Sequence, residues 1–193
     1  NGVKFRWLST KGIEAIGKDA FKGTEKVDKL VVGDGIAYIG DGAFQGSFIK
    51  NVEFSGVTYI GNHVFQGCTY LEDITLTSST TTIGKEAFEG CNKLRSVSLP
   101  EGMKNIGFGA FANCPVLESV DLSENVNGCT IGEYAFYDCT KLSSVKFNDD
   151  YDFAIGKAAF ALSPGNGAAS QLTDFQFPKS IKDYISAANG ETN

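Results

Sequence analysis

The sequence contains little of the chemistry on which most enzymes and nucleic-acid-binding proteins depend. It has one histidine among 193 residues, and its 23 acidic residues outnumber 17 basic ones, which gives a formal net charge of −6. Because nucleic-acid binding usually requires a basic face, this balance argues against that function. No apolar run reaches the roughly 18 residues of a membrane-spanning helix. No signal peptide is visible, and because the chain opens at Asn1 we expect a mature or trimmed segment.

One short pattern recurs along almost the whole chain. The stretch that begins at Ile83 reads I-G-x-x-A-F-x-G-C-x-x-L-x-x-V-x-L, and the pattern starts again at Ile16, Ile39, Ile60, Ile106, Ile131 and Ile155. The successive intervals are 23, 21, 23, 23, 25 and 24 residues. A period in this range marks a solenoid, in which one small unit stacks on copies of itself. Fifteen phenylalanines, against one tryptophan and one methionine, fit a repeat that requires one Phe per unit.

The positions within a repeat predict its local structure. The alternating x-x-Val-x-Leu segment predicts a strand, and stacked strands would form a parallel sheet. The A-F-x-G segment predicts one helical or 3₁₀ turn that buries its Ala and Phe. The Gly after each Ile recurs in all seven copies, which implies either a positive φ or a close backbone approach. The fold class is therefore an α/β-type repeat solenoid, with a parallel β-sheet on one face and short helical turns on the other.

We expect one domain over residues 1–193, because each unit is covered only by its neighbours. It divides into an N-terminal half-repeat cap (1–15), seven repeats (16–177) and a C-terminal cap and tail (178–193). In the first cap, Phe5 and Trp7 can be placed in the rows of Val97 and Leu99. The Gly-rich insertion 163–171 predicts a surface loop, and the spacing over 180–185 predicts a short capping helix.

The five cysteines first suggest a disulfide or metal framework, but four of them share one row of the repeat. A row that accepts Cys, Ser or Thr requires a small side chain that can form a hydrogen bond, and free cysteine is among the most buried residue types. We therefore predict a buried row of free thiols and no zinc, since no CxxC pair accompanies them. Cys129 lies outside the row, in a loop, and is a candidate surface thiol. The row consists of Thr24, Ser47, Cys68, Cys91, Cys114, Cys139 and Ser163.

No catalytic constellation is found. The single histidine, His63, aligns with Asp, Gly, Glu, Tyr and Ala in the other repeats, which indicates a surface position without a triad partner. No acidic pair sits in an otherwise apolar row, as a glycoside hydrolase would require. The acidic loop 148–152 offers oxygen ligands for Ca²⁺ but lacks the spacing of a dedicated calcium loop, so a solvated turn is favoured. We expect no enzymatic activity, no cofactor and no bound metal.

The outward face of the sheet is the candidate partner-binding surface, because repeat proteins commonly bind through the inner curve of the stack. Period-two alternation places polar side chains there, without an aromatic residue. Tyr38 and Tyr59 directly precede two of the repeat isoleucines, and packing against adjacent turns is favoured over an exposed aromatic pair. We call the outward residues the polar face: Lys29, Asn51, Glu53, Asp73, Thr75, Ser96, Ser98, Ser119, Asp121, Ser144, Lys146, Asp174 and Gln176.

The pattern resembles the BspA-like class of leucine-rich repeats, most clearly over 60–76, 83–100 and 106–122, and the match runs from about Phe5 to Pro178. The resemblance implies secreted or surface-displayed proteins, mostly bacterial and some protozoan, often linked to adhesion and host interaction. We therefore expect an extracellular, monomeric, non-catalytic module that binds a protein partner. The alternatives are a rigid spacer within a larger surface protein and, more remotely, a carbohydrate-active enzyme.

Overall fold

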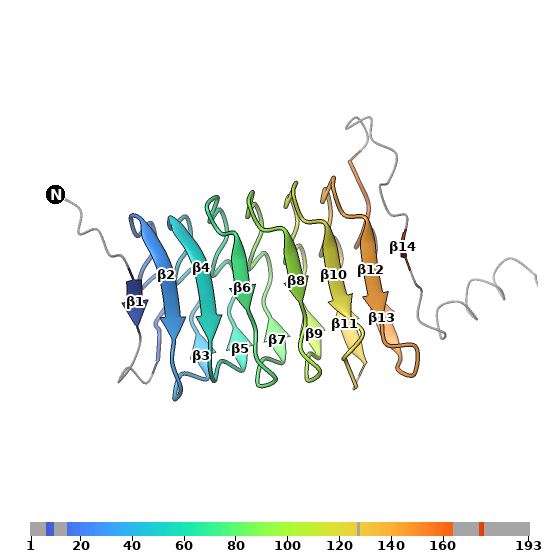
Figure 1. The fold of residues 1–193 in the computed structure, drawn as a ribbon, viewed down its shortest axis with the longest axis horizontal. Coiled ribbons are helices and arrows are strands. Elements are labelled where there is room, and N and C mark those ends of the chain that lie inside the picture. The colour runs from blue at the N-terminus through green and yellow to red at the C-terminus, as the bar shows by residue number, and fades with distance from the viewer. Residues whose placement is uncertain (1–6, 10–14, 127, 164–173, 176–193) are drawn as a thin grey trace, which may run out of the picture.

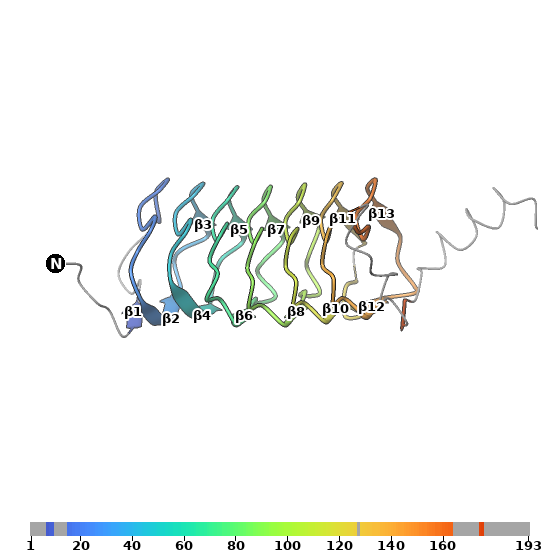
Figure 2. The same cartoon turned by 90° about the horizontal axis from the view of Figure 1, so that it is seen from above.

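The computed structural model describes residues 7–9, 15–126, 128–163 and 174–175. Its strands form three parallel sheets (Figure 1). Two of these sheets continue one another along one face of the body, and the third covers the opposite face (Figure 2). The first sheet contains β1 (Trp7–Ser9), β2 (Val27–Val32), β4 (Ile49–Phe54) and β6 (Asp73–Thr75). The second contains β8 (Ser96–Ser98), β10 (Ser119–Leu122), β12 (Ser144–Phe147) and β14 (Asp174–Phe175).

The third sheet is built from the repeat isoleucines, which lie in register one above the other. Its strands are β3 (Tyr38–Ile39), β5 (Tyr59–Ile60), β7 (Thr82–Ile83), β9 (Asn105–Ile106), β11 (Cys129–Ile131) and β13 (Phe153–Ile155). The described chain is thus a parallel β-solenoid of about six turns. The period and the strand-forming segments are confirmed, whereas a seventh repeat is not. The predicted insertion lies mostly outside the described residues, as do the C-terminal helix and Phe5.

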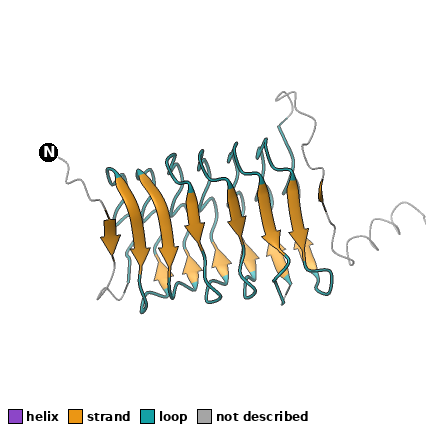
Figure 3. Cartoon of the chain, in the orientation of Figure 1, coloured by secondary structure: helices purple, strands orange, loops and turns teal. Residues whose placement is uncertain are grey.

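The described residues contain no helix, so the expected helical turns are not confirmed (Figure 3). Around Phe88, alternate N–H groups point to the next turn: Glu86 N donates to Phe108 O at 2.8 Å and Phe88 N to Ala110 O at 2.7 Å. The intervening N–H groups close tight turns within the repeat, such as Glu89 N to Glu86 O at 3.3 Å. Backbone donors committed to the neighbouring turn are unavailable for i→i−4 helical bonds.

A left-handed backbone at the fourth position of every repeat also breaks any helix. The residues there have φ between 52° and 65°. Such values favour Gly and are uncommon for other residue types. The residue types in this row have no property in common, but their backbones have the same conformation. Its members are Asp19, Gly42, His63, Glu86, Gly109, Tyr134 and Ala158.

The Gly that follows each repeat isoleucine is required by close approach and not by a positive φ. A Cβ built on Gly84 would stand 2.6 Å from the carbonyl carbon and oxygen of Gly61 in the preceding turn. Gly107 meets Gly84 in the same way. A Cβ on Gly17 would have no described residue within 4 Å. Glycine at this position therefore allows the backbones of consecutive turns to come into contact.

The core is a continuous column of stacked phenylalanines. Ring centroids of successive members are 5.0–5.3 Å apart, and the ring planes differ by 1–10°. Such offset stacking adds to the burial of each ring. Ile, Val and Leu from the two opposed faces complete the interior. The members of the column are Phe21, Phe44, Phe65, Phe88, Phe111, Phe136 and Phe160.

The cysteines are free and buried, as predicted for the repeat row. Cys91 Sγ donates to Phe65 O at 3.4 Å, and Cys114 Sγ donates to Phe88 O at 3.3 Å. Burial raises the pKa of the Cys91 thiol well above its ordinary value. The expectation of a surface thiol at Cys129 is wrong: its side chain is buried in β11, because that residue is paired with Phe153 in the third sheet.

The N-terminal strand differs by three residues from its expected register. Trp7 pairs with Lys29 and Leu8 with Leu30, so Leu8, and not Phe5, lies in register with Leu30 and Val52. A slip by an odd number of residues exchanges the two faces of a strand. The strand β1 therefore extends the first sheet, but in a different alignment from the one predicted.

Candidate functional site

The structure gathers the predicted polar face on the two sheets of one side. Lys29, Asn51 and Asp73 are in one row, and Ser98, Asp121 and Lys146 are in another. Ser96, Ser119, Ser144 and Asp174 make a third row, and Glu53 pairs with Thr75. Gln176 lies outside the described residues. Within each sheet, the described members of the polar face thus lie side by side on neighbouring strands.

Several charges of the polar face are already satisfied within the chain. Lys29 Nζ lies 2.7 Å from Glu53 Oε1, and both side chains are about half exposed. Asp121 Oδ1 accepts hydrogen bonds from the backbone and the hydroxyl of Ser123, at 2.9 and 2.6 Å. Small hydroxyls and internally paired charges give little anchoring energy, since exposed ion pairs contribute roughly 0–1 kcal/mol. The polar face alone is a weak binding surface.

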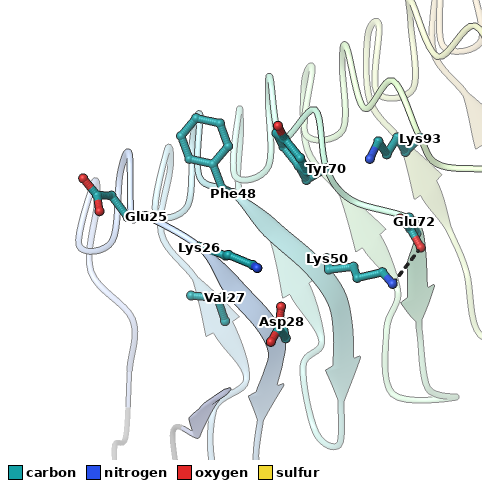
Figure 4. Close-up of a pocket in the computed structure, with 9 residues that line it drawn as sticks. All are labelled: Glu25, Lys26, Val27, Asp28, Phe48, Lys50, Tyr70, Glu72 and Lys93. Atoms are coloured by element: carbon teal, nitrogen blue, oxygen red, sulfur yellow. Dashed lines mark ion pairs between the residues drawn. The ribbon is translucent and has the colours of Figure 1, made fainter. Parts of the chain in front are cut away.

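A groove that the sequence interpretation missed adjoins this face (Figure 4). In each turn the residue just before the buried Leu position points outward, and neighbouring turns place these residues side by side. Lys26, Phe48, Tyr70 and Lys93 occupy successive positions of this row, directly before the buried Val27, Ile49, Leu71 and Leu94. We call this row and its surroundings the aromatic groove. It encloses about 710 Å³ and is also lined by Glu25, Asp28, Lys50 and Glu72.

The two rings of the groove are exposed in spite of their size. Phe48 is 45% and Tyr70 48% accessible, and their centroids lie 5.3 Å apart in an edge-to-face arrangement. Lys93 Nζ stands 4.6 Å from the centre of the Tyr70 ring, a cation–π contact. An exposed aromatic pair of this kind is characteristic of a protein-binding surface.

The charges around the groove are only partly compensated. Lys50 Nζ lies 3.2 Å from Glu72 Oε2. Among the described residues, no carboxylate forms an ion pair with Lys26 or Lys93. The groove therefore combines apolar area with two cations that are available to a partner.

Two further aromatic clusters lie elsewhere on the surface. Tyr38 and Tyr59 stack on β3 and β5 with centroids 5.0 Å apart, and Tyr38 is 47% exposed. The two rings pack on one another, as favoured from the sequence, and Tyr38 is also exposed. Packing between adjacent turns and an exposed aromatic pair are therefore compatible. Phe108, Tyr134 and Tyr137 form the other cluster.

No arrangement for catalysis or metal binding is seen in the described part of the chain. His63 Nδ1 lies 3.2 Å from Glu86 Oε2 and has no nucleophile among its described contacts. In the loop 148–152, the backbone N–H of Asp150 donates to Asn148 Oδ1 at 3.1 Å. Among the described residues, no group of three His, Cys, Asp or Glu side chains could hold a metal ion. The same residues include no helix of the length and apolarity that a membrane span needs.

Parallel strands, a repeat of 21–25 residues and an inward row of Leu, Val and Ile define a solenoid of the leucine-rich-repeat class. The sequence matches the family described as BspA type leucine-rich repeat region in six copies, over residues 7–114 and 58–188. The chain belongs to this family. A search of curated proteins gave no match.

Solved structures support the same fold. The chain is similar to a leucine-rich repeat protein of T. pallidum, with a TM-score of 0.75 and 24% identity over 96% of this chain and 84% of that one. It is also similar to a leucine-rich cell surface protein of Faecalibacterium prausnitzii, with a TM-score of 0.51 and 21% identity over 91% of this chain and 61% of that one. At these identities the comparison establishes the fold only.

Proposed function

We propose that the chain is a non-catalytic adhesion module of a bacterial surface protein, which binds a protein partner through the aromatic groove. One observation carries the proposal: Phe48 and Tyr70 are exposed side by side, between Lys26 and Lys93, which form no ion pair with any described residue. Tyr and Phe are enriched at protein interfaces, and Tyr is one of the residue types that dominate their binding energy. Membership of the BspA-type family and the cell-surface description of the F. prausnitzii protein support the proposed location.

In this proposal the polar face forms the rim of the same interface. Lys29, Asn51, Glu53 and Asp73 lie on β2, β4 and β6, and residues at or directly before the start of these strands line the groove. An interface typically has an apolar centre and a polar, hydrated rim. We therefore expect the groove to determine affinity, while the polar face contributes orientation.

A rigid spacer is the second candidate, and the unbroken phenylalanine column favours it. Stacking from Phe21 to Phe160 and backbone bonds between turns leave few places where the body could bend. Rigidity serves a spacer, but it does not account for the exposed rings. The groove is what distinguishes the two functions.

The test measures binding of the purified chain to immobilised mammalian extracellular-matrix proteins. Tyr70→Lys removes one ring and should preserve the fold, because lysine stands in the same row at Lys26 and Lys93. We expect it to weaken binding by about 30-fold, as for a central anchor. Replacing the polar-face carboxylates by Glu53→Gln and Asp73→Asn should change affinity by less than about fivefold.

Two results would count against this assignment. If the polar-face variant abolishes binding and Tyr70→Lys does not, the groove is not the anchor. If the wild-type chain binds none of the panel, and a longer chain that contains it binds equally well after Tyr70→Lys, the spacer function is supported.

A further inference from the structure

A second surface cluster, separate from the aromatic groove, combines three aromatic rings with two carboxylates. The Phe108 and Tyr134 rings have centroids 5.5 Å apart and planes 58° apart, and Tyr134 meets Tyr137 at 5.3 Å and 82°. These rings, with Glu86 and Glu89, border a hollow of about 230 Å³. Rings at such angles form the walls of a corner. We call these five residues the aromatic corner.

The backbone at Tyr134 has the conformation that the fourth position of every repeat shares. Tyr134 has φ 58°, and the other six residues of the row have φ between 52° and 65°. The aromatic corner therefore differs from the other turns in its side chains and not in its backbone.

Neutral amides hold the carboxylates of the corner in place, and His63 Nδ1 also lies 3.2 Å from Glu86 Oε2. Gln66 Nε2 donates to Glu86 Oε2 at 3.1 Å and to Glu89 Oε2 at 2.6 Å. Asn113 Nδ2 donates to Glu89 Oε1 at 3.2 Å. Neutral donors fix the orientation of a carboxylate without cancelling its charge. The two carboxylates therefore keep a negative potential beside the rings.

The chain already shows which group this environment attracts. Lys85 Nζ lies 3.3 Å from Glu86 Oε1 and 5.5 Å from the centre of the Phe108 ring. One lysine balances one of the two carboxylate charges. Glu89 has no ion pair among the described residues, so an excess of one negative charge remains at the corner.

We propose that the aromatic corner binds the ammonium group of a lysine side chain on a protein partner. Ring faces attract a cation through their quadrupole, and Glu89 supplies the charge of opposite sign. The same carboxylates disfavour an acidic side chain. This contact goes beyond the proposed function, because it lies on different residues from the groove and selects a different chemistry.

Titration of the purified chain with Nα-acetyl-lysine-N-methylamide, followed by heteronuclear NMR, tests the proposal. We expect saturable shifts at Phe108, Asn113 and Tyr134, with a dissociation constant on the order of 10 mM for this single side chain. The norleucine analogue, which has the same length without the ammonium, should bind at least about fivefold more weakly. Equal binding of the two, or no shift at 50 mM ligand (about five times the expected constant), would overturn the proposal.

Three substitutions separate binding from folding, because each introduces a residue type that another turn already has at the same repeat position. Tyr134→Gly follows Gly42 and Gly109, Tyr137→Ala follows Ala112, and Glu89→Gln follows Gln45 and Gln66. Each should weaken lysine binding by about fivefold or more while the other amide signals stay in place. Tyr38→Thr, which removes a ring from the third sheet, and Tyr70→Lys, which alters the groove, should leave the titration unchanged. Unchanged binding in the three corner variants would place the lysine elsewhere.

Discussion

The hydroxyl of Ser47 donates a 2.8 Å hydrogen bond to the backbone carbonyl of Phe21 in the preceding turn. One turn further on, Cys68 Sγ makes the same bond to Phe44 O at 3.2 Å. Cys139 repeats it with Phe111 O at 3.2 Å. The row therefore requires a small buried donor that links consecutive turns, which serine and cysteine both provide. The thiols of this row thus have a structural role, since each bonds to the backbone of an earlier turn.

Replacing Cys91 distinguishes this bonding role from simple packing. Cys91→Ser keeps the donor to Phe65 O and should change the free energy of unfolding by less than about 1 kcal/mol. Cys91→Val removes the donor and adds a branched side chain to a filled site, so a loss of about 1–3 kcal/mol is expected. Urea unfolding measures both. Equal losses for the two variants would contradict the bonding role.

The buried thiols also predict a loss of stability at high pH. Burial raises the pKa of Cys68 from its ordinary value of 9.0 to about 12. Above pH 9 the unfolded chain releases this proton and the folded chain keeps it until about pH 12. The stabilisation is therefore complete below pH 9 and is lost as the pH rises, by about 1.4 kcal/mol per pH unit for one thiol.

Comparison of the wild-type chain with Cys68→Ser isolates this effect from the titration of lysines and tyrosines. The wild type should lose about 2 kcal/mol more than the variant between pH 8 and pH 10.5. Chemical unfolding at the two pH values is the measurement. Parallel losses in both proteins would show that Cys68 ionises equally in the folded and unfolded chains.

The period, the strand rows and the buried Phe and Cys rows were all accessible from the sequence. Each repeat can bury its apolar face only against its neighbours, so the core positions recur at a fixed spacing. The conformation of the A-F-x-G segment was not accessible. A short segment with one buried Ala and one buried Phe suits a helical turn as well as a ladder between turns. The deciding feature is the positive φ at the fourth position of the repeat. Only Gly42 and Gly109 are glycines there, so the residue types do not reveal this conformation.

The aromatic groove was hidden by an irregular repeat. The unit that begins at Ile39 is short, so Phe48 is one residue closer to its isoleucine than Tyr70 is to Ile60. An alignment from the isoleucines therefore separates the two rings, whereas the pairing of Val27 with Ile49 aligns the chain from the buried Leu position. The aromatic corner draws rings from the third, fourth and seventh positions of two turns. A comparison one row at a time could not bring them together.

Truncation of one stacked ring tests the central column of the core. Phe111→Ala removes a buried ring that stacks on Phe88 at 5.0 Å and Phe136 at 5.2 Å, and should destabilise the chain by about 3–5 kcal/mol. Ser98→Ala, on the exposed polar face, should be neutral within about 0.5 kcal/mol. Denaturant unfolding of both variants compares them. Similar losses would mean that the inward and outward rows have been exchanged.

Two glycines of the same row give a matched test of backbone contact between turns. At Gly84, an added Cβ would stand 2.6 Å from the backbone of Gly61, and main-chain atoms cannot turn aside as a flexible side chain can. Gly84→Ala should therefore force the turns apart and lower the free energy of unfolding by about 1–3 kcal/mol or more. Gly17 has the same place in its repeat, but a Cβ there would have no described residue within 4 Å. Gly17→Ala should be neutral or slightly stabilising, because Ala restricts the unfolded chain. Urea unfolding compares the two variants. If Gly17→Ala were as destabilising as Gly84→Ala, contact between turns would not explain why glycine recurs in this row. Its backbone conformation would then be the reason.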